Sequence, residues 1–172
     1  MGLDMYLTKG YYVKNWDHMT DDEKHQITIL KGGKPSSIPV EKISSIVTEE
    51  IRWRKANAIH RWFVEKVQEG KDDCGDYYVS REQLQELLAD VSKVLEIAQK
   101  PRHEVMARLS GKDIAPEAVE EASKILPTSE GFFFGSNSYD EYYLDDLQFT
   151  KDELTKVLAI NDNGSFHYGS SW

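Results

Sequence analysis

The polar residues best suited to chemistry lie on one stretch of predicted helix, residues 54–69. Asn57, His60 and Arg61 are three and four residues apart, so a helix places them on one stripe. An imidazole titrates near neutral pH, and a guanidinium matches the geometry of phosphate and carboxylate groups. The stripe is therefore a candidate general base or anion site. The simpler interpretation, which we favour, is a solvated face whose side chains bond to nearby backbone.

Tyr77 and Tyr78 could complete a ligand pocket with that stripe. In this hypothesis the protein binds a small ligand or a nucleotide derivative and could hydrolyse it. The two tyrosines follow a glycine-containing turn, residues 72–76, in which three aspartates surround the single cysteine. Carboxylates so close together could hold a hard cation, but the calcium-loop spacing of acids is absent. We interpret the turn as an acidic structural loop.

Sequence signals for metals and cofactors are missing. The five histidines are scattered along the chain and have a single thiol to join them, whereas zinc sites need Cys and His at short spacing. The glycines at 32–33 and 131–135 lack the spacing and the lysine of phosphate-binding loops. We predict no metal site and no cofactor, and we assign no catalytic residue.

The most unusual local feature is a run of three phenylalanines between two glycines. Three successive aromatic side chains cannot all point into one core from a single strand face, so we expect at least one of them to be exposed. With the tyrosines that follow, the run could anchor a protein partner or stack on a base. A segment buried on both sides is an equally good interpretation. The candidate partner-binding residues are Phe132, Phe133, Phe134, Tyr139 and Tyr143.

Apolar patterning predicts the strands that must position these residues. Residues 4–13 are typical of a strand, and residues 25–31 and 37–40 of a hairpin around Gly32-Gly33. The second half of residues 43–53 favours a strand, and a turn at 161–164 precedes a last short strand at 165–172.

Helical periodicity accounts for most of the remaining chain. We predict a helix over residues 54–69, a second that begins at the capping-box sequence Ser80-Arg81-Glu82-Gln83 and continues until Pro101, and a short third that begins at Pro116 and ends at Pro127. A fourth helix is predicted from a second capping box at 138–141. The fold class is therefore α+β, a single domain over residues 1–172. We expect a small, mostly antiparallel sheet that includes the N- and C-terminal strands, packed with about four helices.

Composition narrows the function classes. The chain has 172 residues, a formal charge of −9 and a pI near 5.0, so we expect no direct binding to nucleic acid. An acidic surface that imitates nucleic acid stays open as an alternative. A lone cysteine, no secretory leader and no long apolar run predict a cytoplasmic protein without membrane contact.

Four stretches of the chain resemble a family of uncharacterised proteins encoded by bacteriophages and prophages. They are MGLDMYL (1–7), WRKANAIHRWFV (53–64), DDCGDYYVSREQL (72–84) and GFFFGSNSYDEYYLDDL (131–147). The resemblance implies a context and no particular activity, because small phage accessory proteins often bind a host protein or a defence component. We therefore expect a non-catalytic factor that binds such a protein in the host cytoplasm. The alternative is the small-ligand binder or hydrolase that uses the stripe.

Overall fold

The computed structural model describes residues 2–98, 114, 116–131 and 134–172 and confirms an α+β fold. Among these residues it contains four α-helices, a four-stranded sheet and a two-stranded sheet. In chain order the elements are β1 (Asp4–Tyr12), β2 (Leu30–Lys31), β3 (Lys34–Pro35), the 3₁₀ helix η1 (Val40–Lys42), β4 (Ser45–Arg54), α1 (Asn57–Lys66), β5 (Asp76–Val79), α2 (Arg81–Ala98), α3 (Pro116–Ile125), α4 (Glu141–Ala159) and β6 (Ser165–Ser171).

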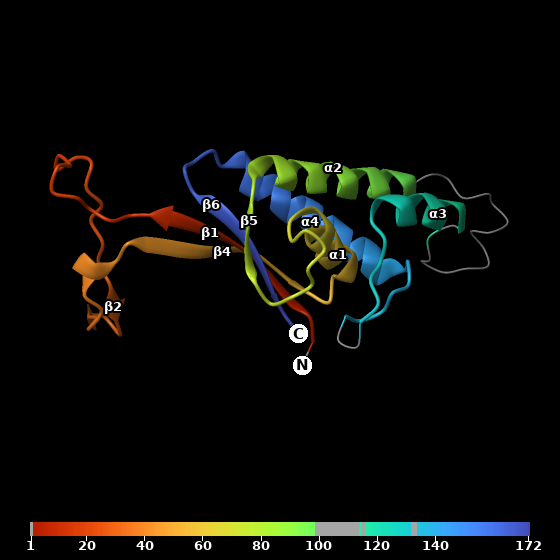
Figure 1. Ribbon diagram of the computed structural model, residues 1–172, viewed down its shortest axis with the longest axis horizontal. Coiled ribbons are helices and arrows are strands. Elements are labelled where there is room, and N and C mark those ends of the chain that lie inside the picture. The colour runs from red at the N-terminus through yellow and green to blue at the C-terminus, as the bar shows by residue number, and fades with distance from the viewer. Residues whose placement is uncertain (1, 99–113, 115, 132–133) are drawn as a thin grey trace.

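The main sheet is antiparallel with strand order β4-β1-β6-β5, so the terminal strands β1 and β6 are neighbours as predicted. Asp4 pairs with Ser171, and the two chain ends lie close together (Figure 1). Along β1 the side chains of Met5, Leu7 and Lys9 are buried while those between them are partly exposed. This period of two assigns one sheet face to the core.

The core lies between that face and the helices, and Phe63 of α1 is at its centre. The Phe63 ring stacks on Tyr168 of β6 with centroids 3.9 Å apart, and it meets Trp62 edge-on at 5.3 Å and Trp53 of β4 at 5.9 Å. Helices α2 and α4 add further leucines and valines to this cluster. The helices gather along one side of the sheet (Figure 1).

Capping boxes were predicted at the starts of two helices, and the structure has one of them. The backbone N–H of Ser80 donates to Oε1 of Gln83 at 2.9 Å, and the N–H of Gln83 donates to Oγ of Ser80 at 3.1 Å. This reciprocal pair confirms the capping box before α2. Helix α4 instead begins after Asp140, whose carboxylate accepts from the N–H groups of Tyr142 and Tyr143. The capping box expected at 138–141 is therefore wrong, since a carboxylate two residues later accepts both bonds.

The strand predictions need two corrections. In place of strands at 25–31 and 37–40, the hairpin is formed by the two-residue strands β2 and β3, and η1 follows. This hairpin has no third strand to extend its pairing, and Pro35 and Pro39 cannot donate to a ladder. Strand β5 was missed because its sequence looks like the end of an acidic turn, and its pairing with β6 involves residues about ninety positions away.

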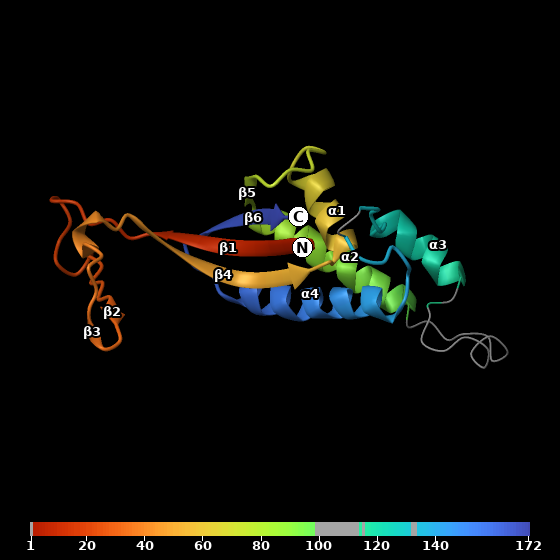
Figure 2. The same cartoon turned by 90° about the horizontal axis from the view of Figure 1, so that it is seen from below.

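Residues 13–44, which we call the arm, project from the rest of the molecule. Strands β1 and β4 stay paired as far as Tyr12 and Ser45, whereas β6 ends its pairing at Gly10. The sheet thus narrows to a two-stranded ribbon that carries the arm away from the helices (Figures 1 and 2). Of all the arm residues, Val13 alone is buried.

A lysine is buried on the helix-facing side of β1. Lys9 is 1% exposed, and its Nζ lies 2.6 Å from Oδ1 of Asp162 and 4.8 Å from the Phe166 ring centroid. A Cβ at Gly164 would lie 2.6 Å from Cε of Lys9, so only glycine leaves room for the lysine stem. Burial lowers the pKa of Lys9, but its bonds to Asp162 and Tyr11 outweigh this and raise the pKa overall.

Candidate functional site

Asn57 begins α1 and bonds to backbone groups of Ser129, Phe134 and Ser136. Its Nδ2 donates to the carbonyl oxygens of Phe134 at 3.2 Å and Ser136 at 2.7 Å, and its Oδ1 accepts from the N–H of Ser129 at 3.1 Å. The side chain is buried and its amide takes part in three bonds. The expected bonding to backbone is therefore present at Asn57. The expected solvent exposure is not, because the side chain is buried.

Arg61 contributes to the same attachment from one turn later. One NH1 hydrogen bond reaches the carbonyl of Thr128 at 3.1 Å, and Nε donates to Glu65 at 2.6 Å. The N–H of Thr128 in turn donates to the hydroxyl of Tyr139 at 3.2 Å. Arg61 thus bonds to groups of its own chain, in line with the simpler of the two interpretations. It does not present a free guanidinium for an anion.

His60 is fully buried and forms two hydrogen bonds. Its Nε2 lies 3.0 Å from Oδ1 of Asp72, and its Nδ1 lies 2.7 Å from the hydroxyl of Tyr168. A carboxylate only accepts, so the neutral imidazole carries its proton on Nε2 and accepts the Tyr168 proton at Nδ1. The Phe134 ring packs edge-on against it at 5.1 Å. The histidine has no exposed atom with which to act as a general base on a bound molecule.

The environment of His60 predicts a loss of stability in acid. Burial lowers the pKa of His60, with Asp72 opposing that shift. The unfolded chain therefore binds the proton more readily, so the His60 contribution is complete above its ordinary pKa of about 6.5 and is lost as the pH falls below it. Urea unfolding between pH 8 and 5 will show this decline. In His60→Gln the decline over that window will be shallower, and an unchanged slope would contradict the assignment.

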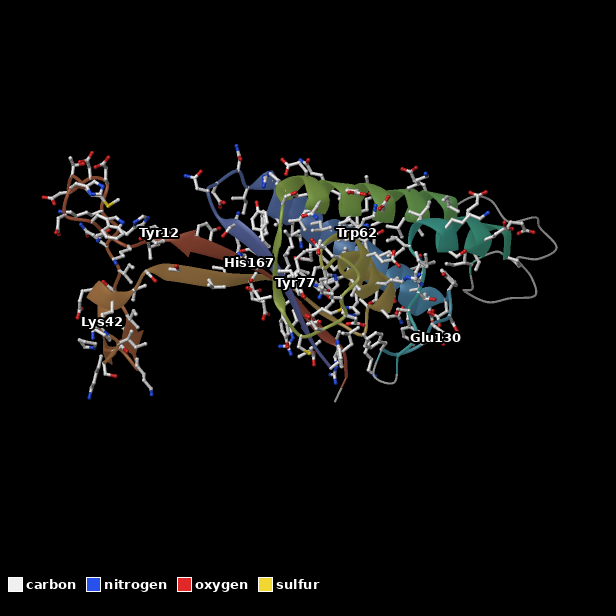
Figure 3. All side chains as sticks on the ribbon, viewed as in Figure 1. Tyr12, Lys42, Trp62, Tyr77, Glu130 and His167 are labelled. Atoms are coloured by element: carbon white, nitrogen blue, oxygen red, sulfur yellow. The ribbon has the colours of Figure 1, made fainter. Side chains whose placement is uncertain are left out.

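The two tyrosines predicted to line a pocket with the stripe lie elsewhere. Tyr77 and Tyr78 are in β5, where the Tyr77 hydroxyl donates to the Asp73 carboxylate and the exposed Tyr78 meets His167 edge-on at 6.0 Å. In the β5–β6 pairing Tyr77 lies opposite Tyr168 and Tyr78 lies opposite His167, and Figure 3 labels Tyr77 and His167 on these two strands. Asn57, by contrast, faces the loop 128–136. The structure does not bring the five predicted ligand residues around one cavity.

The aromatic segment is largely part of the core. Phe134 and Tyr143 are buried, and the Tyr143 hydroxyl donates to the carbonyl of Leu126 at 2.9 Å. Tyr139 is partly buried, with its ring 4.9 Å from that of Tyr143. Phe134 and Tyr143 are therefore wrong as exposed anchors for a partner, because both side chains pack inside their own body, whereas the assignment of Tyr139 stays a prediction. Phe132 and Phe133 lie outside the described residues.

A cavity of about 340 Å³ lies where the end of β4 and the start of α1 face the start of α4. Thr128, Gly135, Ser136 and Ser138 close one side of it, and Asn57 bonds to Ser136 there. Its lining residues are Arg54, Lys55, Ala56, Asn57, Ala58, Ile59, Thr128, Gly135, Ser136, Ser138, Asp140, Tyr142, Tyr143, Asp145, Asp146 and Leu147. Of the predicted ligand residues, Asn57 alone lines this cavity.

Charged groups of both signs line this cavity. Arg54 and Lys55 come from the β4–α1 junction, and the carboxylates come from the first two turns of α4 and its cap. Burial raises the pKa of Asp146 to about 7, with the charges of Asp145 and Asp140 adding to the effect. No sequence pattern indicated this site, because Asp146 is one acid among many until the fold brings the start of α4 to the β4–α1 junction.

The arm presents a second kind of site, a projecting surface rich in exposed apolar side chains. With the adjoining ribbon it holds seven of the twelve large hydrophobic residues that are exposed in the described chain: Tyr12, Trp16, Leu30, Ile38, Val40, Ile46 and Val47. A depression of about 330 Å³ lies at its base, lined by Val13, Asn15, His25, Ile27, Val40, Glu41 and Ile43. In Figure 3, Lys42 marks the arm and Tyr12 marks the end of β1 that leads to it. Both lie well away from Trp62 among the helices.

Hydrogen bonds that involve backbone groups give the arm a defined shape. Nδ2 of Asn15 donates to the carbonyl of His25 at 2.9 Å, and the N–H of His25 donates back to Oδ1 of Asn15 at 2.8 Å. The N–H of Val13 donates to the carbonyl of Ser44 at 2.9 Å and closes the arm at its base. The exposed apolar residues are therefore held on an ordered scaffold.

Comparisons with known proteins leave the chain without an assigned relative. No family model matches it, and neither the curated proteins nor the solved structures contain a match. In the part of the chain that the structure describes, no helix has the length and apolar character needed to cross a membrane. Over the same residues, no group of three or more histidines, cysteines or carboxylates could hold a metal ion.

Proposed function

We propose that the protein is a non-catalytic binding factor that docks onto a protein partner through its arm. The observation that carries this proposal is the arm itself, which exposes apolar side chains while only Val13 is buried within it. Surface patches of that kind mark interaction sites more often than chance exposure does. This moves the predicted binding surface from residues 132–143 to residues 13–44.

The energetics of the arm favour a partner. A two-stranded ribbon is only marginally stable in water, because no helix or second sheet packs on it to bury its side chains. Ile38 and Leu30 keep 54% and 57% of their surface exposed in the free chain, so a large part of their apolar area is still in contact with water. Covering such groups contributes about 25 cal/mol per Å² of apolar surface removed from water. A partner surface would supply the missing layer, and the depression at the base could receive one of its side chains.

Charge indicates the chemistry of the partner. The arm carries five lysines and five carboxylates, so the whole formal charge of −9 belongs to the rest of the chain. Within residues 30–42 three lysines, Lys31, Lys34 and Lys42, accompany the single Glu41. The hairpin end is therefore basic and apolar, which suits a partner groove lined with apolar residues and edged by carboxylates. In keeping with the phage resemblance, we propose that this partner is a host or defence protein.

Site-specific crosslinking in bacterial lysate tests the proposal. A photo-reactive amino acid at Ile38 will join the protein to a partner, whereas the same probe at Ile160, exposed on the body, will not. To test the surface, the probe is placed at Val40 and the double change Leu30→Ser/Ile38→Ser is added. This variant will no longer form the crosslinked complex, and its melting temperature will not fall. The matched control Ile160→Ser will keep it.

Two outcomes would overturn the arm as the binding surface. One is a complex that survives the Leu30→Ser/Ile38→Ser change with unaltered affinity. The other is crosslinking from Ile160 that equals crosslinking from Ile38. If the captured partner is a second copy of this chain, light scattering will report a dimer, and the proposed host or defence partner is wrong.

A further inference from the structure

The cavity at the β4–α1 junction is independent of the arm and separates opposite charges on facing walls. Arg54 and Lys55 line the wall contributed by β4 and α1, and Asp140, Asp145 and Asp146 line the wall contributed by α4. Across the described residues neither Arg54 nor Lys55 forms an ion pair with these carboxylates. Opposite charges that line one partly open cavity without pairing with each other favour a ligand that bears both charges.

Lys55 is built into its wall. It has a left-handed backbone with φ 63°, unusual for a residue with a side chain, and Gly135 packs against its stem, where an added Cβ would lie 3.3 Å from the Lys55 Cβ. Gly135 itself has φ 86° and belongs to the loop that Asn57 fastens. The cationic wall is therefore positioned by backbone geometry on both sides.

Asp146 is the distinctive group on the acidic wall. Among the described residues its carboxylate has no hydrogen-bond partner, while its backbone carbonyl accepts an intrahelical bond from Oγ1 of Thr150 at 2.6 Å. Asp140 differs because its carboxylate already caps α4. A partly buried carboxylate without a donor lowers its energy when a ligand N–H group approaches, since charge-assisted bonds are stronger than neutral ones.

We propose that this cavity binds a small zwitterion of the α-amino acid class, with the ligand carboxylate toward Arg54 and Lys55 and the ligand ammonium group against Asp146. The volume of about 340 Å³ lies at the small end of ligand cavities, which run from about 300 to 1,000 Å³. Thr128, Ser136 and Ser138 also line the cavity and add polar groups that suit a polar side chain of the ligand.

Calorimetry with defined probes tests this site. The twenty proteinogenic amino acids are titrated singly at pH 8 into the full chain, and for each binder the N-acetyl derivative and the carboxamide are titrated as well. We expect at least one amino acid to bind and both of its derivatives to bind at least tenfold more weakly, because each derivative has lost one charge. No binding by any amino acid at 10 mM would overturn the proposal.

Variants locate the binding. Asp146→Asn will weaken binding about ten- to a hundredfold, the value of a lost charge-assisted bond, and Arg54→Gln will weaken it in the same direction. Asp152→Asn, also on α4 but outside the cavity, will bind like the parent chain. Melting temperatures of all three establish that they are folded. Equal affinity in Asp146→Asn and the parent would place the ligand elsewhere and refute the site.

The pH profile gives a readout that a purely structural Asp146 would not produce. The titratable groups facing it are Asp140 and Asp145 from α4 and its cap, and Arg54 and Lys55 from the β4–α1 junction. Since the pKa of Asp146 is about 7, an ammonium ligand will bind tightest above that pH and about tenfold more weakly for each unit below it. A flat profile between pH 8 and 5.5 would contradict the ammonium–Asp146 contact.

Discussion

Replacing Phe63 with alanine will lower the free energy of unfolding by about 3–5 kcal/mol, the range for a buried aromatic ring truncated in a core. Phe63 has no exposed surface and contacts the rings of Trp53, Trp62 and Tyr168. Its removal leaves a cavity between a helix and two strands that cannot close without moving all three. Urea unfolding followed by tryptophan fluorescence measures the change.

The matched control is Phe149→Ala on α4, where the ring is 42% exposed. We expect a cost below about 1 kcal/mol there, since a large share of the side chain is already in contact with water. Similar losses in the two variants would show that Phe63 is not the centre of the core. Phe63→Leu will fall between them because it keeps most of the apolar volume.

Neutralising Asp162 will cost about 3 kcal/mol, the lower end of the range for breaking a buried ion pair, because Asp162 itself is partly exposed. Asp162→Asn keeps an oxygen that can accept from the N–H of Gly164, so the turn is preserved. The change removes the countercharge of Lys9, whose side chain is 2% exposed. An unpaired ammonium group in that position has no water to solvate it.

The double variant Lys9→Met/Asp162→Asn distinguishes charge from packing. With both charges gone, methionine fills the apolar channel beside Phe166 and the cost will fall below about 1 kcal/mol, as for other buried pairs replaced by apolar residues. A double variant as unstable as Asp162→Asn alone would show that the loss came from the turn. Melting curves at pH 7 for the parent, the two single variants and the double variant give the coupling energy.

The predictable part of the fold is the part set by local chemistry. The capping box at Ser80 and Gln83 forms as expected, and β1, α1 and β6 follow their apolar periods. Elements set by distant contacts were missed or misplaced. Strand β5 exists because β6 pairs with it, and the hairpin in the arm is short because no third strand extends it.

The sites were harder to predict because they depend on packing. The spacing of Asn57, His60 and Arg61 correctly places them on one helical stripe, yet spacing does not indicate whether the stripe faces solvent or a loop. Asn57 instead bonds to Ser136 and its neighbours, 79 positions along the chain. The phenylalanine run presented the same difficulty, because burial of Phe134 depends on contacts with His60 that no local pattern encodes.

The sheet order also has a consequence for how the chain is made. In space β6 lies between β1 and β5, but on the ribosome it emerges after both of them. Until residues 165–171 leave the exit tunnel, β1 offers one edge with unpaired backbone groups, and the Phe63 ring lacks its Tyr168 partner. Closing that gap joins residues about 160 positions apart, a contact that forms slowly. Nascent or prematurely terminated chains will therefore be the species most prone to aggregate and most dependent on chaperones.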